Sequence, residues 1–292
     1  MMATFDDRRA QPADAQADVR VEAVTYTYPG APRPALSDIT LRVTQGEYIA
    51  LLGHNGSGKS TLSRIIGGLV APNHGRVTIS GLDVAAAESR AQVREIVGMI
   101  FSDSDNQIVA TVVEDDVAWG LAARALPLAE IRARAATALA AVGLSHAAGR
   151  APWELSGGQR QRLTIAGALA LEPRVLIADE PTAMLDPAAR RDIAGLLLRL
   201  NRDHGLTIIH VTHLLEEAAQ ASRVVALEEG RIALDEPPCE ALADLDRLRA
   251  LRLVIPDTAR LVESLRARGL PVPAEALTPD TLVAALERAA QE

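Results

Sequence analysis

The chain has 292 residues, of which 48% are hydrophobic and 23% charged, and its formal net charge is -8. This length and composition fit one large or two modest globular domains. The negative charge and an aromatic content of 2% argue against a nucleic-acid-binding surface, which needs basic and stacking side chains. A single cysteine, Cys239, excludes an internal disulfide and a cysteine-cluster metal site.

The N-terminal region has no hydrophobic periodicity before about residue 21. Residues 1–20 are rich in Ala, Asp, Gln and Arg, which predicts a disordered N-terminal lead. This lead lacks a secretory apolar core, and no apolar run in the chain approaches the roughly 18 residues that span a bilayer. We therefore expect the chain to stay in the cytosol. Strand patterns over residues 21–28, 39–43 and 48–52 then predict a small β subdomain.

Strands and helices alternate along the middle of the chain. Further strands are predicted over residues 76–80 and 96–101, with a short helix before the second of them. Residues 174–180 and 207–213 are continuous apolar runs that end in polar residues, which is typical of central strands in a parallel sheet. The pattern predicts an α/β fold, and the C-terminal ends of these strands should carry the chemistry.

Two other segments have helical patterns. Residues from about 107 to 170 form an insert with long Ala, Leu and Arg stretches, including a predicted helix over residues 128–142. Beyond Asp235 the pair Pro237 and Pro238 interrupts the alternation, and three helices are predicted over residues 242–254, 258–269 and 278–290. We expect residues 236–292 to form a small helical accessory domain.

The most specific motif is residues 53–61, which fit G-x-x-x-x-G-K-[ST] between a predicted strand and a predicted helix. Its three glycines let backbone N–H groups and the helix N-terminus face a phosphate together. Lys59 supplies a charge for the outer phosphates, and the Ser60 hydroxyl suits Mg²⁺. An ordinary glycine-rich turn is the alternative, although such turns rarely have Lys-Ser at the helix start. The predicted nucleotide-binding residues here are Gly53, His54, Asn55, Gly56, Ser57, Gly58, Lys59, Ser60 and Thr61.

Asp179 and Glu180 end the predicted strand over residues 174–180, beside the expected phosphate loop. Asp179 suits Mg²⁺ binding through water. Glu180 can act as the general base for the water that attacks the γ-phosphate. A solvent-exposed acidic strand end is the alternative, because a carboxylate pair alone is a weak signal.

The phosphate loop, Leu-Ser-Gly-Gly-Gln at residues 155–159, Asp-Glu-Pro-Thr at 179–182, Leu-Asp at 185–186 and His213 occur in the order of an ABC-transporter ATPase. The resemblance covers about residues 21–235. It implies a P-loop NTPase core with a parallel-sheet RecA-like subdomain, an antiparallel β subdomain and a helical subdomain at about 107–170. It also implies an ATPase that uses ATP and Mg²⁺.

In that family two ATPase subunits pack head to tail, and each ATP lies between the phosphate loop of one and the signature motif of the other. The resemblance therefore implies that Ser156, Gly157, Gly158 and Gln159 bind the γ-phosphate held by a second subunit, identical or paralogous. A Ser-Gly-Gly at a helix start is itself an anion site, although an isolated one is more often just a helix cap.

Three further residues take roles from the resemblance. His213 corresponds to the switch histidine, which contacts the γ-phosphate and fixes Glu180 and the attacking water. Asp186 resembles the aspartate that links the two sites across the dimer, although exposed loop aspartates are common. Tyr28 is where the family has an aromatic that stacks on adenine, and a structural tyrosine is the alternative. His210 is interpreted as a structural residue.

One position departs from the family pattern. The family has glutamine directly after the strand that ends here at Phe101, and this chain has Ser102. A serine hydroxyl cannot span the distance of a glutamine amide, so direct metal ligation from this side is doubtful. Gln107 is a displaced substitute at best. Our hypothesis is that hydrolysis is retained while its coupling to transport differs.

Residues 103–120 resemble the energy-coupling factor ATPases, which power the uptake of vitamins and of cobalt or nickel ions. The resemblance implies a transmembrane coupling subunit and a substrate-binding membrane subunit as partners, and a peripheral location on the cytoplasmic face of the cell membrane. Asp103, Asp105 and residues 114–116 form a predicted acidic rim, which suits an arginine-bearing helix of the membrane partner. A solvated acidic face is the alternative.

Two other functions stay open. The chain could serve an ABC transporter of another substrate class, since only residues 103–120 and the helical tail argue against this. Soluble ABC ATPases that act on ribosomes or DNA are the other class. They typically carry two fused cores or a long coiled-coil insertion, and this chain has one phosphate loop, no repeat and no heptad run.

Overall fold

The computed structural model describes residues 17–274 and 276–289 and contains a four-stranded antiparallel sheet in the order β2-β1-β4-β5. Its strands are β1 (Ala17–Tyr26), β2 (Leu36–Thr44), β4 (His74–Ile79) and β5 (Leu82–Asp83). The prediction that the first strand begins at residue 21 was wrong. Val19 is already fully buried in the alternating pattern of β1, so residues 17–20 belong to the sheet. The rest of the predicted lead, residues 1–16, lies outside the described residues.

The second sheet has six strands in the order β10-β9-β3-β8-β7-β6. These are β3 (Tyr48–Leu52), β6 (Val97–Ile100), β7 (Val175–Asp179), β8 (Thr207–Val211), β9 (Arg223–Glu228) and β10 (Arg231–Glu236). All neighbours pair in parallel except β10, which pairs antiparallel with β9 at the edge. Every residue of β3 and β8 is buried, as expected for central strands covered on both faces.

The central strands separate two hydrophobic cores. Ile49 and Leu51 of β3 pack on one face with the antiparallel sheet and with helix α1 (Lys59–Ile66). Tyr48, Ala50 and Leu52, which point to the other face, join the core formed with the helices. Helix α2 (Ala87–Ile96) contributes Val93 to the first core. The alternation along one strand therefore joins the two halves of the fold.

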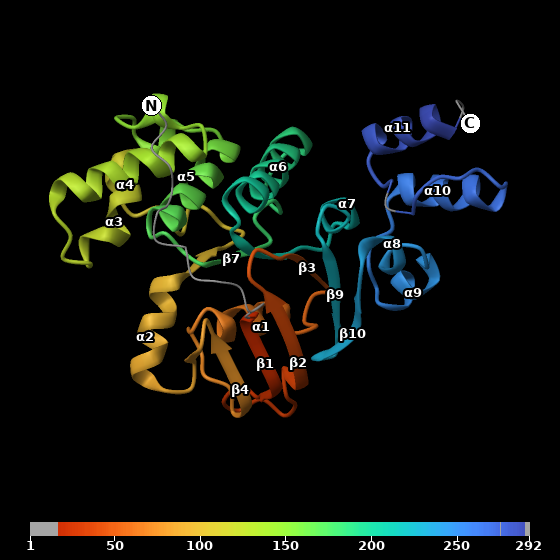
Figure 1. Cartoon of the computed structure of the whole chain (residues 1–292), viewed down its shortest axis with the longest axis horizontal. Coiled ribbons are helices and arrows are strands. Elements are labelled where there is room, and N and C mark those ends of the chain that lie inside the picture. Colours follow the sequence, from red (N-terminus) through yellow and green to blue (C-terminus); the bar gives the residue numbers. More distant parts are fainter. Residues whose placement is uncertain (1–16, 275, 290–292) are drawn as a thin grey trace.

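The predicted insert is helical, and α3, α4 and α5 pack against one another. These helices are α3 (Val113–Ala122), α4 (Leu128–Ala141) and α5 (Gly157–Ala170). Single 3₁₀ turns lie between them at Ser145–Ala147 and Pro152–Glu154. Figure 1 shows this group at one end of the molecule, with α6 (Pro187–His204) between it and the short α7 (Leu215–Ala218).

The C-terminal helices lie at the opposite end of the molecule (Figure 1). The prediction of one helix over residues 242–254 was wrong, because the chain forms α8 (Pro238–Ala241) and α9 (Leu245–Ala250) instead. Asp244 explains the break, since its carboxylate accepts a hydrogen bond from the Arg247 amide and starts a new helix. The two later helices, α10 (Asp257–Ala267) and α11 (Pro279–Ala289), are close to their predicted positions.

The hydrophobic contacts of this tail are divided between two cores. Leu245, Leu248 and Leu253 belong to the large core under the central sheet. Val262, Val272 and Leu282 instead form a small cluster of their own. The first part of the segment 236–292 is thus packed on the large core of the preceding residues, and its assignment as a separate accessory domain stays a prediction.

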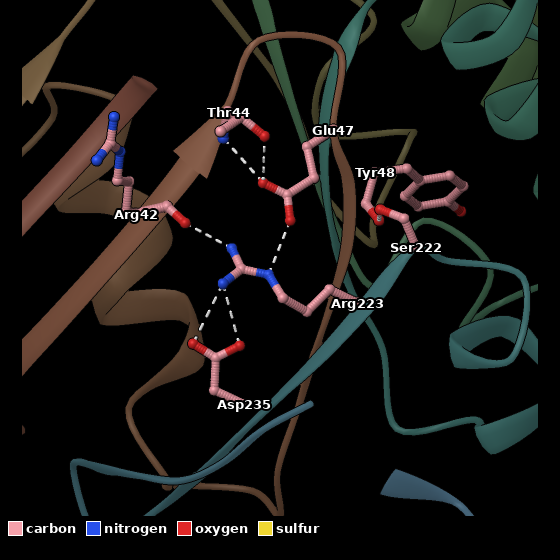
Figure 2. Close-up of polar contacts among 7 residues, drawn as sticks. All are labelled: Arg42, Thr44, Glu47, Tyr48, Ser222, Arg223 and Asp235. Carbon is pink, nitrogen blue, oxygen red and sulfur yellow. Dashed lines mark hydrogen bonds and ion pairs between the residues drawn. The ribbon is translucent and has the colours of Figure 1, made fainter. Parts of the chain in front are cut away.

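One arginine connects the two sheets (Figure 2). Arg223 at the start of β9 donates to Glu47 Oε1 at 2.7 Å, to both carboxylate oxygens of Asp235 at 3.1 and 3.3 Å, and to the carbonyl of Arg42 in β2. The other oxygen of Glu47 accepts from the amide and hydroxyl of Thr44. This network fixes the turn between β2 and β3. The phosphate loop follows at the other end of β3.

Replacing this arginine by lysine tests the network. Arg223→Lys keeps the charge but lacks the planar fork needed for three acceptors. We expect it to lower the thermal midpoint of unfolding by roughly 3–8 °C, because lost charge-assisted hydrogen bonds cost about 1–3 kcal/mol. Arg76→Lys is the matched control, since the Arg76 side chain is 62% exposed and makes an ion pair with Asp83. Equal shifts in the two variants would contradict the connecting role.

Candidate functional site

The phosphate loop joins β3 to α1, as the motif predicted. Gly53 and Gly58 have φ values of +149° and +109°. A Cβ on Gly53 would lie 2.4 Å from Ser57 Oγ, and one on Gly58 would lie 2.7 Å from the carbonyl oxygen of Ala35. Both positions therefore exclude any side chain, and the tight loop directs its backbone toward the start of the helix.

Lys59 is the first residue of α1 and is buried, with 5% of its surface exposed. Its ammonium donates to the carbonyl oxygens of Gly53 at 2.7 Å and His54 at 3.1 Å. Burial lowers the pKa of Lys59, while the carboxylates of Glu180 and Asp179 raise it. Within the described part of the chain, Ser57 Oγ and His54 Nε2 are buried without a hydrogen-bond partner, which suits a loop built for a polar ligand.

Ser60 and Asp179 meet at the end of β7. Burial raises the pKa of Asp179, and a hydrogen bond from the Ser60 hydroxyl opposes this. A hydroxyl beside a carboxylate is the oxygen donor set that Mg²⁺ uses together with phosphate oxygens. No group of three or more His, Cys, Asp or Glu within residues 17–274 and 276–289 could hold a metal ion. The Ser60 hydroxyl and the Asp179 carboxylate fit a Mg²⁺ ion by the chemistry of their oxygen atoms.

Glu180 directly follows β7 and lies beside the C-terminal end of the neighbouring strand β8. Its backbone is left-handed, with φ of +50°, and its amide donates to the carbonyl of Val211 in β8 at 2.9 Å. The Oε2 atom of its carboxylate lies 3.5 Å from Nδ1 of His213. Both side chains are partly exposed, at 25% for Glu180 and 43% for His213. The structure thus brings together the two predicted catalytic residues.

Tyr28 lies over the first turn of α1. Its hydroxyl is 3.1 Å from Thr61 Oγ1, and its ring packs edge-on against Tyr26 with centroids 4.9 Å apart. Tyr28 and Glu180 line one cavity of about 380 Å³. The other residues that line it are Ala35, Asn55, Gly56, Gly58, Lys59, Ser60 and Thr61. The predicted adenine contact therefore lies at the same cavity as the predicted phosphate contacts.

The signature residues are found at the start of α5. Ser156 caps this helix, accepting from the Gln159 amide at 3.3 Å, and Gln159 Oε1 accepts from the Ser156 amide at 2.9 Å. Gly158 packs so closely on α6 that a Cβ would lie 3.0 Å from Cβ of Ala189. Asp186 caps α6, and hydrogen bonds from the Ala189 and Ala188 amides lower the pKa of Asp186.

The signature lines a cavity of its own, of about 340 Å³. Ser156, Gly158, Gln159 and Asp186 lie in its wall. None of the residues that line this cavity also lines the cavity at the phosphate loop. One chain therefore has two separate cavities, one at the phosphate loop and one at the start of α5.

Ser102 and Gln107 follow β6. The Gln107 amide accepts from the Phe101 N–H at 2.8 Å and donates to the carbonyl of Met99 at 3.3 Å. Its side chain is thus used to hold the end of the strand. Whether Gln107 substitutes for the glutamine that Ser102 replaces stays a prediction.

The predicted acidic rim is mostly used within the chain. Asp103 accepts from the amides of Asp105 and Asn106, and Asp116 accepts from the amides of residues 109 and 110. Asp105 forms an ion pair with Arg160 of α5 at 2.7 Å. Three of the five carboxylates thus have partners within the chain, and the docking role of the rim stays a prediction. Glu114 and Asp115 remain exposed at the start of α3.

Sequence reasoning missed one acidic residue near the site. Glu217 in α7 is 5% exposed and accepts hydrogen bonds from Thr182 and Thr212, which follow Glu180 and precede His213. Glu217 follows Glu216 in the sequence, and such a pair at the start of a short helix resembles a solvated surface. Only the three-dimensional packing distinguishes the two glutamates.

A family model and several curated proteins are similar to this chain. A family model described as ABC transporter matches residues 36–183. The energy-coupling factor transporter ATP-binding protein EcfA1 of Symbiobacterium thermophilum is 50% identical over 272 residues, covering 91% of this chain and 95% of that protein. EcfA1 of Lactobacillus delbrueckii is 43% identical and covers 92% of this chain and 96% of its own.

Solved structures resemble the fold as well. The cbiO1 protein from Clostridium perfringens, part of the ABC transporter complex cbiONQ, is 36% identical with a TM-score of 0.74, covering 85% of this chain and 99% of that one. A dimeric post-hydrolysis state of the cassette MJ0796 with ADP and Pi has 33% identity and a TM-score of 0.68, covering 75% and 98%. No helix among the described residues is long and apolar enough to cross a membrane. This chain belongs to the ATPases of the ABC transporter family, among the energy-coupling factor transporter ATP-binding proteins.

Proposed function

We propose that this ATPase powers an energy-coupling factor importer, in which it drives the uptake of a vitamin or a transition-metal ion through a membrane partner. The observation that carries the proposal is the presence of two separate phosphate-suited cavities in one chain, at Lys59 and at Ser156. The cavity at the signature residues shares no lining residue with the cavity at the phosphate loop. It could therefore bind the phosphates of a nucleotide held by a second subunit. Two such chains, identical or paralogous, would form two composite sites.

Within one composite site, each residue has a distinct task. The amides of the phosphate loop and the α1 N-terminus bind the phosphates, and Lys59 neutralises the outer ones. Tyr28 offers its ring to adenine. Mg²⁺, held by Ser60 and through water by Asp179, would supply positive charge to the outer phosphates. Glu180 accepts the proton of the attacking water, and His213 orients Glu180 and contacts the γ-phosphate.

The second subunit completes the site from the opposite side. Ser156, Gly157 and Gly158, with Gln159, present the α5 N-terminus to the γ-phosphate of the partner's nucleotide. Asp186 lies in the same cavity wall as Ser156 and is a candidate to link the two sites. Because each nucleotide contacts both subunits, ATP binding holds the two subunits together, and its hydrolysis lets them separate.

The membrane partners are proposed from the relatives. The relatives are named as transporter subunits, and cbiO1 is part of a complex cbiONQ. We propose a transmembrane coupling subunit, a substrate-binding membrane subunit that determines the cargo, and a peripheral location on the cytoplasmic face of the membrane. An ABC transporter of another substrate class is the second candidate, and action on ribosomes or DNA is the third.

Co-purification distinguishes these functions. When the native complex is solubilised in mild detergent and isolated through this chain, we expect a small, highly hydrophobic membrane subunit to accompany it. The Arg76→Lys protein, which should fold normally, can be used as a second bait and should recover the same partners. Recovery with ribosomes or DNA, and without a membrane protein, would overturn the transporter proposal.

The isosteric variant Glu180→Gln tests the general base. We expect its ATPase kcat to fall by about 10²–10⁴-fold, since the amide cannot take the proton. Nucleotide binding should persist, so ATP should trap the variant as a closed dimer in size-exclusion chromatography. Lys59→Ala is the comparison, because it should lose both hydrolysis and ATP-dependent dimer formation. Hydrolysis by Glu180→Gln at the parent rate would show that Glu180 is not the base.

Ser102→Gln tests the departure from the family pattern. Restoring the longer amide should leave hydrolysis in place but change the ratio of ATP hydrolysed to cargo transported in the reconstituted complex. Both rates should be measured on the same proteoliposomes. If neither rate changes, the serine has no mechanistic weight.

A further inference from the structure

A buried cluster of polar side chains lies beneath the proposed catalytic pair. Glu217 Oε1 accepts a hydrogen bond from the Thr182 hydroxyl at 2.6 Å, and Oε2 accepts one from the Thr212 hydroxyl at 2.6 Å. Nε2 of His210 lies 3.3 Å from the same Oε2, and its Nδ1 is 2.9 Å from the Tyr48 hydroxyl. All five residues are less than 9% exposed.

A carboxylate this deeply buried needs partners. Burial alone would raise the pKa of Glu217, but the contacts with His210, Thr182 and Thr212 outweigh it and lower the pKa to about 2. The group is therefore ionised at neutral pH. Two threonine hydroxyls donate to it from the ends of two neighbouring strands, and the His210 ring lies beside it.

The two threonines connect Glu217 to the ends of two strands. Thr182 comes two residues after Glu180, in the turn where the Ala183 amide bonds to the Glu180 carbonyl at 3.2 Å. Thr212 comes immediately before His213, and its hydroxyl also accepts from the amide of Leu214 at 3.1 Å. The Glu217 side chain thus connects the loop that follows Glu180 to the segment that precedes His213.

The proposed catalytic pair has weaker restraints of its own. The contact between Glu180 and His213 is 3.5 Å long and both side chains are partly exposed. Glu180 is also left-handed, with φ of +50°, a conformation that persists in a non-glycine residue only where the surroundings impose it. The fixed groups nearby are the threonines bound to Glu217.

We infer that Glu217 is a positioning residue for hydrolysis: through Thr182 and Thr212 it sets the distance and orientation of Glu180 relative to His213. Glu217 does not line the cavity at the phosphate loop, and in this inference it acts through the two loops. The inference rests on the proposed roles of Glu180 and His213. A purely structural anchor for the four-residue helix α7 is the competing explanation, and the two differ in what they predict for kinetics.

The test is steady-state ATPase kinetics of Glu217→Gln and Thr212→Val in the full chain. Each substitution preserves shape. Glu217→Gln replaces one accepting oxygen by a donating nitrogen and removes the charge, and Thr212→Val removes the hydroxyl that donates to Glu217. We expect kcat to fall by roughly 10–100-fold, because small misplacements of reacting groups have effects of this size. The KM for ATP should change by less than about threefold, since neither Glu217 nor Thr212 lines the cavity at the phosphate loop. Thr212→Ser, which keeps the hydroxyl, should retain kcat within about twofold.

Thr207→Val is the matched control. Thr207 is a fully buried threonine at the opposite end of the same strand β8, and its hydroxyl bonds to Asp18 and to the amide of Gly46. Its loss should lower the melting temperature as much as Thr212→Val while leaving kcat unchanged. Glu216→Gln, one residue from Glu217, controls for the change from carboxylate to amide.

The outcomes separate the possible failures. If Glu217→Gln and Thr212→Val lower kcat no more than Thr207→Val does, Glu217 is only an anchor and the inference is overturned. If Glu217→Gln does not fold, the contrast between Thr212→Val and Thr212→Ser decides in the same way. If Glu180→Gln is inactive while Glu217→Gln has the parent kcat, only this inference fails. If Glu180→Gln keeps the parent rate, the proposed role of Glu180 fails and this inference fails with it.

Discussion

The parallel pairing of β3, β8 and β7 is the constraint on which the rest of the structure depends. Leu51 pairs with Val211, and Val211 pairs with Asp179, so the three strands end at one level. Chain directions in a parallel sheet are equal, and everything that follows these strands emerges at one edge. The phosphate loop, Glu180 and His213 meet there although they are far apart in sequence. Burial on both faces fixes the register, because a slip of one residue would exchange the two hydrophobic cores.

The parts that sequence predicted are those with local causes. Continuous apolar runs gave the central strands, and the glycine spacing gave the phosphate loop. Capping explains both a success and a failure. Ser156 and Gln159 form a capping box three residues apart, at the helix start expected for the Ser-Gly-Gly motif. Asp244 is an equally good cap, but it lies inside a run that had been interpreted as one helix. Helical spacing alone did not reveal that interruption.

The parts that sequence did not predict depend on distant contacts. The left-handed backbone of Glu180 has no signal in the residue type, because glutamate rarely adopts it. The acidic residues of the segment 103–116 have the composition of a fully solvated face, yet Asp103 and Asp116 accept hydrogen bonds from nearby amides. Glu217 had the composition of surface and is buried. In each case the decision between solvent and an internal partner is made by packing, which a charge pattern does not contain.

Glu180 and Glu217 have opposite environments, and one carboxylate cannot have both. A general base must reach its water and change protonation, so it needs some exposure and few fixed partners. A group that holds backbone in place needs several fixed partners and must keep its charge. Glu180, 25% exposed and 3.5 Å from His213, has the first environment, and Glu217, bonded to two threonines, has the second. Those bonds offset the cost of burying Glu217, and in our proposal they order the loops that carry Glu180 and His213.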